Sequence, residues 1–146
     1  MSVEYLLGII STLIATLIAW LCKQWYENRQ FQSKYSGKWE TKIYDTNDTV
    51  VKSDILEIKH NKKTFIVKGT LKRKFPEIER GKCWFISGIL QNNIFVWYTY
   101  TYEPIPSMAS SCVRLEDDYC FKGYYLRFNE STKENEKIKI ELRKIP

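Results

Sequence analysis

Basic and aromatic residues recur toward one end of several predicted strands, and together they suit a ligand that carries phosphates and flat bases. The candidates for such a ligand-binding site are Lys72, Lys74, Tyr98, Tyr100, Tyr102, Tyr125 and Arg127. A guanidinium group binds phosphate through a fork of hydrogen bonds, and aromatic rings stack on nucleobases. The alternative is that the tyrosines belong to the hydrophobic core and the lysines solubilise the loops.

The positive charge of the chain is concentrated in one segment. Net charge is +6, and residues 61–82 alone contain eight Lys or Arg against Glu77 and Glu79. An anionic partner is therefore expected near this segment, whether a lipid headgroup, a nucleic acid or a phosphorylated small molecule. We favour the small molecule over a nucleic-acid polymer. The alternative is a solvated outer strand face that bears lysines.

Motifs typical of catalysis or metal binding do not occur in this sequence. It has no phosphate-cradling glycine loop, nucleophile elbow or H-E-x-x-H motif, so we expect no enzymatic activity and no metal or cofactor. Four widely spaced cysteines indicate reduced thiols. His60 alternates with Leu56 and Ile58 and is expected to be a packing residue, and the acidic run at residues 116–118 is expected to form a turn.

From residue 37 onward the hydrophobic pattern has a period of two, which predicts β-strands. An aromatic content of 15% also favours a strand-rich domain. The eight predicted strands cover residues 38–45, 50–60, 64–73, 82–90, 94–103, 110–116, 119–128 and 137–144. Their number is sufficient to close a small barrel that holds side chains or one ligand.

The connections between these strands alternate in length. Tight turns are expected near residues 61–63, 91–93 and 117–118, with longer links between them. In an up-and-down antiparallel barrel this places the tight turns at one closed end and the longer loops at an open, basic mouth. Trp39 begins the first strand at the closed end and is expected to plug it, whereas Asp45 lies at the mouth. The alternation in residues 94–103 leaves open which face lines the interior.

The N-terminal segment is suited to a membrane. Residues 5–22 contain no charged side chain, and a helix of this length crosses most of a ~30 Å hydrocarbon core. We expect one transmembrane helix at residues 1–23, a polar juxtamembrane linker at 24–36 and the barrel domain at 37–146. A signal peptide is the alternative, but the segment before the apolar run carries Glu4 instead of basic residues and no A-x-A-like cleavage site follows.

Small residues line one stripe of this helix and suit close helix–helix contact in lipid. They are Gly8, Ser11, Thr12, Ala15, Thr16 and Ala19. Self-association of the anchor is therefore expected, although Ala and Thr are also simply tolerated in anchors. Lys23, Arg29, Lys34 and Lys38 follow the helix, which predicts an outside N-terminus and a cytoplasmic C-terminal domain.

An N-terminal membrane helix, a short basic linker and a compact all-β domain that opens with YSGKWETKIYD at residues 35–45 resemble the membrane-anchored β-barrel effectors of bacterial CBASS antiphage systems. The SGKW run is also similar to the opener of lipocalin-like barrels, in which the tryptophan plugs the closed end. The CBASS family typically has two transmembrane helices, and this sequence supplies one.

The resemblance implies an antiviral defence effector in the bacterial inner membrane, in contact with its lipids. Its barrel would sense a cyclic di- or trinucleotide made by a partner nucleotidyltransferase, and binding would drive homo-oligomerisation, membrane disruption and death of the infected cell. Related barrels are instead held silent by a nucleotide, so the sign of regulation stays open. The alternatives are a membrane-anchored, lipocalin-like binder of a small apolar ligand and an interaction scaffold with a solid core.

Overall fold

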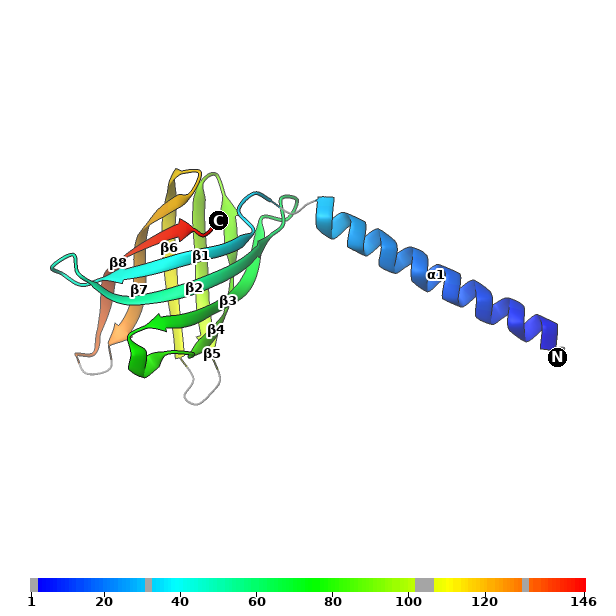
Figure 1. Cartoon of the computed structure of the whole chain (residues 1–146), viewed down its shortest axis with the longest axis horizontal. Helices are drawn as coiled ribbons and strands as arrows, with labels where there is room; N and C mark the ends of the chain where they lie inside the picture. Colours follow the sequence, from blue (N-terminus) through cyan, green and yellow to red (C-terminus); the bar gives the residue numbers. More distant parts are fainter. Residues whose placement is uncertain (1–2, 31–32, 102–106, 130–131) are drawn as a thin grey trace. The chain divides into compact units, whose positions relative to one another are not determined.

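The computed structural model describes residues 3–30, 33–101, 107–129 and 132–146. It contains one helix, α1 (Val3–Gln30), and a closed antiparallel barrel (Figure 1). The chain divides into two compact units, Met1–Gln32 and Ser33–Pro146. The predicted fold class, an eight-stranded up-and-down barrel preceded by one apolar helix, is confirmed.

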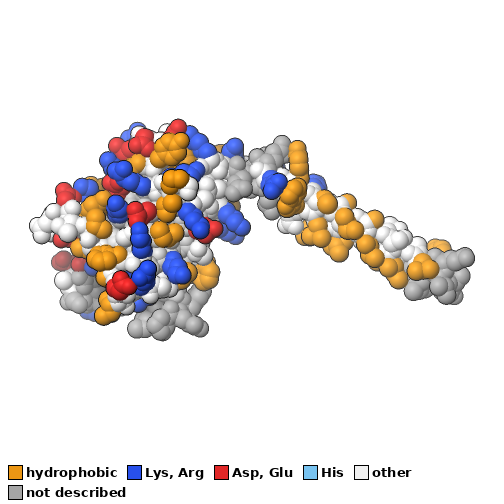
Figure 2. All heavy atoms as spheres, in the orientation of Figure 1, with side chains coloured by type: hydrophobic (Ala, Val, Ile, Leu, Met, Phe, Trp, Pro, Cys, Tyr) orange, Lys and Arg blue, Asp and Glu red, His pale blue; other side chains and the backbone are white. Residues whose placement is uncertain are grey.

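The α1 helix is long and apolar enough to cross a membrane over Leu7–Glu27. Its surface is predominantly hydrophobic along this stretch (Figure 2). The helix extends to Gln30, through the first part of the segment that we expected to be a linker. The Thr12 hydroxyl donates to the Gly8 carbonyl oxygen and the Thr16 hydroxyl to the Thr12 carbonyl oxygen, each at 2.8 Å. These two hydroxyl protons are therefore used within the helix, and the predicted small-residue stripe favours helix contact mainly through the small size of its side chains.

The barrel follows the chain order, and each strand pairs with its neighbours in sequence. The strands are β1 (Gly37–Tyr44), β2 (Val50–His60), β3 (Ile66–Phe75), β4 (Cys83–Gln91), β5 (Ile94–Thr101), β6 (Ser107–Asp117), β7 (Cys120–Asn129) and β8 (Glu134–Lys144). Pairing of β1 with β8 closes the sheet, so that no strand edge is exposed.

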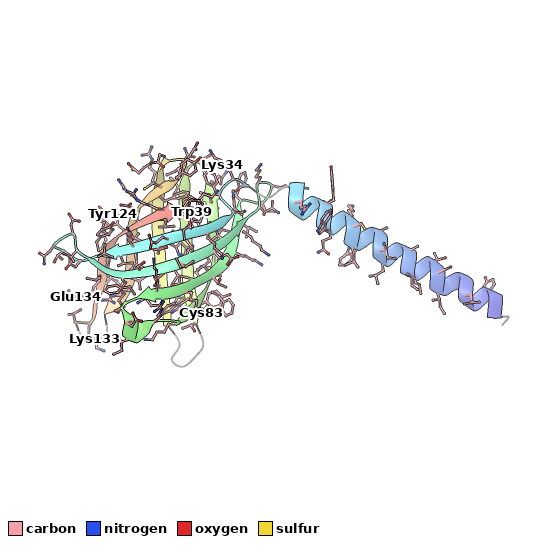
Figure 3. All side chains as sticks on the ribbon, viewed as in Figure 1. Lys34, Trp39, Cys83, Tyr124, Lys133 and Glu134 are labelled. Carbon is pink, nitrogen blue, oxygen red and sulfur yellow. The ribbon has the colours of Figure 1, made fainter. Side chains whose placement is uncertain are left out.

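Two of the three connections at one end, those between β4 and β5 and between β6 and β7, are tight two-residue turns as predicted, whereas the third, between β2 and β3, has five residues, 61–65. The two-residue turn between β4 and β5 consists of Asn92 and Asn93, whose φ angles of 52° and 64° match the backbone twist of a hairpin. At the other end, a short 3₁₀ helix, η1 (Glu77–Glu79), lies in the link between β3 and β4. Figure 3 places Lys34 and Trp39 toward the turn end and Cys83, Lys133 and Glu134 toward the loop end.

Trp39 fills the closed end of the barrel, which confirms its predicted position. Its side chain is fully buried, packs edge-on against Phe121 at 5.2 Å and donates its indole N–H to the carbonyl oxygen of Tyr35 at 2.9 Å. His60 is also buried there, between the Ser33 hydroxyl at 2.5 Å and the Leu90 carbonyl at 3.1 Å. It is a packing residue, as expected, and burial lowers its pKa.

Gly123 allows two strands to approach closely inside the barrel. A Cβ at this position would lie 2.1 Å from the carbonyl oxygen of Cys112 on the neighbouring β6. Any larger residue would therefore have to push β6 and β7 apart. This contact explains why β7 carries a glycine among otherwise large residues.

Candidate functional site

A partly enclosed cavity of about 130 Å³ occupies the interior of the barrel at its long-loop end. It is lined mainly by inward-facing side chains of the strands and by one residue of η1. The lining consists of Thr41, Ile43, Lys52, Asp54, Leu71, Arg73, Glu79, Trp84, Trp97, Thr99, Met108, Ala109, Ser111, Tyr125 and Ile140. The cavity thus combines aromatic rings with several charged groups.

Arg73 is the centre of the charged group. Its guanidinium is 7% exposed, donates Nε–H to Asp54 and Nη1–H to Glu79, and lies 5.1 Å from the centre of the Trp84 ring. A register shift in the β2–β3 pairing occurs between Ser53 and Asp54, and beyond it Asp54 lies directly opposite Arg73. This irregularity leaves Ser53 and Asp54, although consecutive, both buried.

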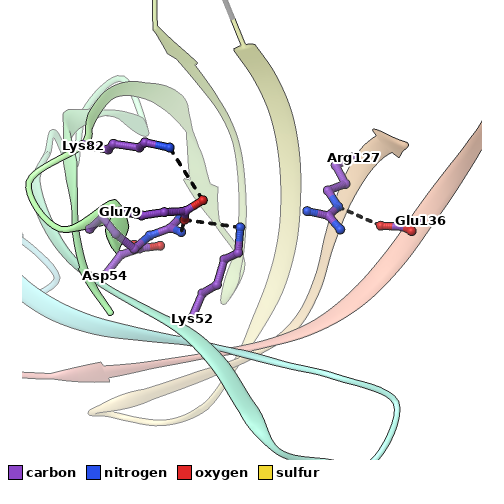
Figure 4. Close-up of polar contacts among 7 residues, drawn as sticks. Lys52, Asp54, Glu79, Lys82, Arg127 and Glu136 are labelled. Atoms are coloured by element: carbon purple, nitrogen blue, oxygen red, sulfur yellow. Dashed lines mark hydrogen bonds and ion pairs between the residues drawn. The ribbon is translucent and has the colours of Figure 1, made fainter. Parts of the chain in front are cut away.

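Glu79 gathers three cations at the mouth of the cavity (Figure 4). Besides Arg73, its carboxylate lies 3.5 Å from the Lys52 ammonium and 3.6 Å from that of Lys82. Burial alone would raise the pKa of Glu79, but Lys52, Arg73 and Lys82 together lower it. The η1 link therefore places one anion at a point where three positive charges converge.

Asp54 is the most perturbed acid of the site. Burial raises its pKa from 3.8 to about 6, against the opposing effect of Arg73. The neighbouring Tyr125 hydroxyl also has a raised pKa, again chiefly because of burial. These shifts indicate an interior in which charge is costly unless it is paired.

Two buried polar groups in the cavity wall have no hydrogen-bond partner among the described residues. They are the Trp97 indole N–H and the Thr41 hydroxyl, on side chains that are 2% and 0% exposed. Trp97 is held in place by stacking on Phe95, with ring centres 4.3 Å apart. Because a buried polar group without a partner is costly, these atoms are suited to a ligand or a water molecule.

Of the predicted site residues that the structure describes, two lie inside the barrel. Tyr125 lines the cavity, and Arg127 points inward at the mouth, where its Nε donates to Glu136 at 2.7 Å. Lys72 and Lys74 lie on the outer face of β3, and Lys74 pairs with Glu40 at 2.8 Å. We expected these two lysines at the basic mouth; they lie near the loop end of β3 with outward side chains, and their part in ligand binding stays a prediction.

Two tyrosines of β5 that we named as candidate ligand-binding residues, Tyr98 and Tyr100, do not line the interior. Phe95, Trp97 and Thr99 face the interior, whereas Tyr98 is on the outer surface with 47% of its area exposed. Tyr100 shares the outer face and contacts Phe85 there, with ring centres 5.8 Å apart. Tyr102 lies outside the described residues.

Comparisons with family models, curated proteins and solved structures found no match for this chain. What the site can do therefore depends on its own geometry. The described residues contain no group of three or more His, Cys, Asp or Glu side chains arranged to hold a metal ion. The cavity brings cations and the unpartnered Trp97 indole N–H together beside aromatic rings, in a half-closed space.

The raised pKa of Asp54 predicts a specific pH dependence of stability. Because the folded state holds the Asp54 proton more tightly than the unfolded chain, this residue favours folding most below pH 3.8, and the benefit is lost as pH rises through about 6. Relative to D54N, the wild-type barrel should lose about 3 kcal/mol of unfolding free energy between pH 3.5 and 7.5.

Guanidinium unfolding of the full chain in detergent, followed by tryptophan fluorescence at both pH values, measures this difference. The comparison with D54N removes the opposite trend expected from His60, whose pKa is lowered and which favours folding as pH rises toward 6.5. A difference between wild type and D54N that does not change with pH would contradict the assignment.

Proposed function

We propose that this protein is a membrane-anchored sensor of antiphage defence whose barrel binds a cyclic di- or trinucleotide. A partner nucleotidyltransferase supplies the nucleotide upon infection. Binding controls self-association of α1, and the assembled helices disrupt the bacterial inner membrane. The barrel lies in the cytoplasm, because Lys23, Arg29, Lys34 and Lys38 follow the helix and positive residues are retained on that side.

The proposal that the barrel binds a ligand is supported by one observation. A single cavity contains a hydrogen-bond donor without a partner and cations whose present partner, a carboxylate, a ligand could replace. The Trp97 indole N–H has no partner among the described residues, and three cations share one carboxylate, that of Glu79. A phosphate group offers more acceptor oxygens than a carboxylate and forms strong bonds with guanidinium and ammonium groups. In this proposal the ligand phosphate takes the place of the Glu79 carboxylate.

The size of the cavity limits how the ligand is held. Sites that enclose a whole small molecule measure roughly 300–1,000 Å³, whereas this cavity of about 130 Å³ is close to one that encloses a single benzene ring, at ~150 Å³. One base or one phosphate therefore enters the barrel, and the rest of the nucleotide contacts the mouth. Arg127 and Lys82 lie there, with 40% and 52% of their side chains exposed.

The same lining argues against the alternative of a small apolar ligand. Asp54, Arg73 and Glu79 face the cavity, and an apolar molecule would remove water from them without offering any hydrogen bond. A lipocalin-like apolar site would instead require neutral side chains at these positions.

Replacement of Glu79 should strengthen nucleotide binding, because it removes the competing anion. We expect cyclic di- or trinucleotides to raise the Tm of the full chain in detergent, and E79Q to lower the Kd of the active nucleotide by about tenfold, which is ~1.4 kcal/mol. A thermal-shift screen of such nucleotides, followed by titration calorimetry, measures both.

E77Q is the matched control, since Glu77 lies in the same 3₁₀ helix but pairs with the exposed Arg80 at 2.8 Å. Its Kd should equal that of wild type. The proposal is rejected if no cyclic nucleotide shifts the Tm, or if a nucleotide binds with the same affinity to wild type, E79Q and E77Q.

If the assembled α1 helices disrupt the membrane, the damage should depend on contact between α1 helices of different chains. Expression of the full chain in a bacterial host together with its nucleotide should depolarise the inner membrane, read by a potential-sensitive dye. A15L should reduce the effect by enlarging the small-residue stripe, whereas L17I, outside that stripe, should not. Equal depolarisation by A15L and wild type would show that the stripe is not the contact.

A further inference from the structure

The outer surface of the barrel is divided into a charged side and an apolar side. On β1, β2 and β8, acidic and basic side chains alternate and pair, as the contacts of Lys42 with Glu40 at 3.9 Å and of Lys139 with Asp48 at 2.7 Å show. Figure 2 shows this side, on which blue and red side chains mix. The outward residues of β3 to β7 are of a different kind.

Apolar side chains form a continuous row across these five strands. This row is set by direct cross-strand neighbours and consists of Ile66, Ile89, Val96, Cys112 and Tyr124. The adjacent row is mixed and consists of Lys68, Ser87, Tyr98, Ser110 and Leu126, and the row beyond it contains Phe85, Tyr100 and Met108 on β4 to β6. We call the two apolar rows, together with Ile94, Tyr98 and Leu126, the outer apolar face.

This outer apolar face is exposed to solvent over its whole width. Ile89 is 55% exposed, Phe85 52% and Met108 75%, and no described part of the barrel unit covers them. Scattered exposed apolar residues are normal, but a contiguous patch across five strands marks a surface that contacts something.

Basic residues border this face. Lys68 and Lys72 lie beside it on β3, Arg114 and Lys122 lie on β6 and β7, and Lys137 on β8 rests 3.8 Å from the centre of the Tyr124 ring. Among the described residues of β3 to β7, Glu116 and Asp117 at the end of β6 are the only acidic ones. Aromatic and aliphatic side chains surrounded by lysine and arginine are the composition of a surface that lies on anionic lipid headgroups.

The connection to α1 keeps a bilayer within reach of this face. Two residues, 31 and 32, separate Gln30 from Ser33, where the chain joins the barrel by donating its N–H to the His60 carbonyl. The three Cα–Cα steps from Gln30 to Ser33 span at most about 11 Å. Ile66 and Ile94 begin their strands at this same turn end, so the outer apolar face starts beside the point of attachment.

A second copy of the chain suits this face less well. Contact between two such faces would bring two borders of lysine and arginine together with only two carboxylates on each side, whereas an anionic bilayer neutralises the lysines and arginines. Tethering also raises the effective concentration of the bilayer far above that of another barrel.

We propose that the outer apolar face is a membrane-docking surface, by which the barrel lies against the anionic headgroups of the bilayer that holds α1. Phe85, Ile89, Tyr98 and their neighbours insert at the headgroup level, and the bordering lysines contact lipid phosphates. The inference rests on membrane anchorage through α1 and is independent of nucleotide binding in the barrel interior.

Cys112 provides a native probe, because it is exposed at the middle of the face between Val96 and Tyr124. The full chain with C22S and C83S retains Cys112 and the buried Cys120. It is placed in nanodiscs of phosphatidylcholine alone or mixed with phosphatidylglycerol, and the rate of reaction with an uncharged polyethylene-glycol maleimide is measured. The matched control adds C112S and K38C, which moves the thiol to the exposed outer side of β1.

We expect the reaction of Cys112 to slow several-fold in the anionic nanodiscs and that of K38C to stay unchanged. The additional substitution K122E should restore the fast rate by reversing one border charge. Equal reaction rates for Cys112 in both lipids would overturn the proposal. Protection of Cys112 that depends on the number of chains per nanodisc, and not on lipid charge, would also overturn it, because that result indicates contact with a second copy of the chain. A chain that does not bind nucleotide but shows the lipid-dependent protection would reject the proposed function alone.

Discussion

The open end of the barrel depends on the burial of one guanidinium group. Arg73 is almost completely removed from solvent, and a buried cation is stable only when carboxylates compensate it. Asp54 supplies one partner from the neighbouring strand, and Glu79 supplies the other from η1, so the pair of bonds ties the β3–β4 link to the strands. The position of the link over the cavity follows from this requirement.

Closure of the sheet explains why the two ends differ. Side chains fill the turn end, where Trp39, Phe95 and Phe121 pack in edge-on contacts at 5.2 and 6.1 Å. Toward the loop end the inward residues become smaller or polar, as Thr41, Thr99 and Ser111 show, and space remains. Among the described residues, this interior space therefore lies toward the loop end, where Lys52 and Lys82 lie.

Much of the fold could be predicted from the sequence because a barrel strand imposes a period of two and tight hairpins need specific residues. The interior of the site was harder to predict because β5 carries large apolar or aromatic residues on both faces, so alternation alone does not separate Trp97 from Tyr98. Which face of β5 lines the interior is decided by closure of the barrel. Closure depends on all eight strands and cannot be read from the sequence of β5 alone.

The inward position of Arg73 was not predicted from the sequence. The signal was present in β3, where Arg73 shares its face with Val67 and Leu71, both buried. A charged residue is normally assigned to the solvent side, and only the carboxylates of Asp54 and Glu79 make the inward position stable. The irregular pairing at Ser53 and Asp54 brings the Asp54 carboxylate opposite Arg73, and no sequence pattern predicts this irregularity.

The central claim is that the cavity beside Arg73 binds a cyclic nucleotide. The most direct measurement is the indole N–H signal of each tryptophan in ¹⁵N-labelled full-length protein, recorded in detergent micelles during a nucleotide titration. The account predicts that the Trp97 signal shifts because its free N–H gains an acceptor, and that the Trp84 signal shifts with it, whereas the Trp39 signal at the closed end stays in place. Unchanged Trp97 and Trp84 signals at saturating concentrations of every cyclic di- and trinucleotide would contradict it.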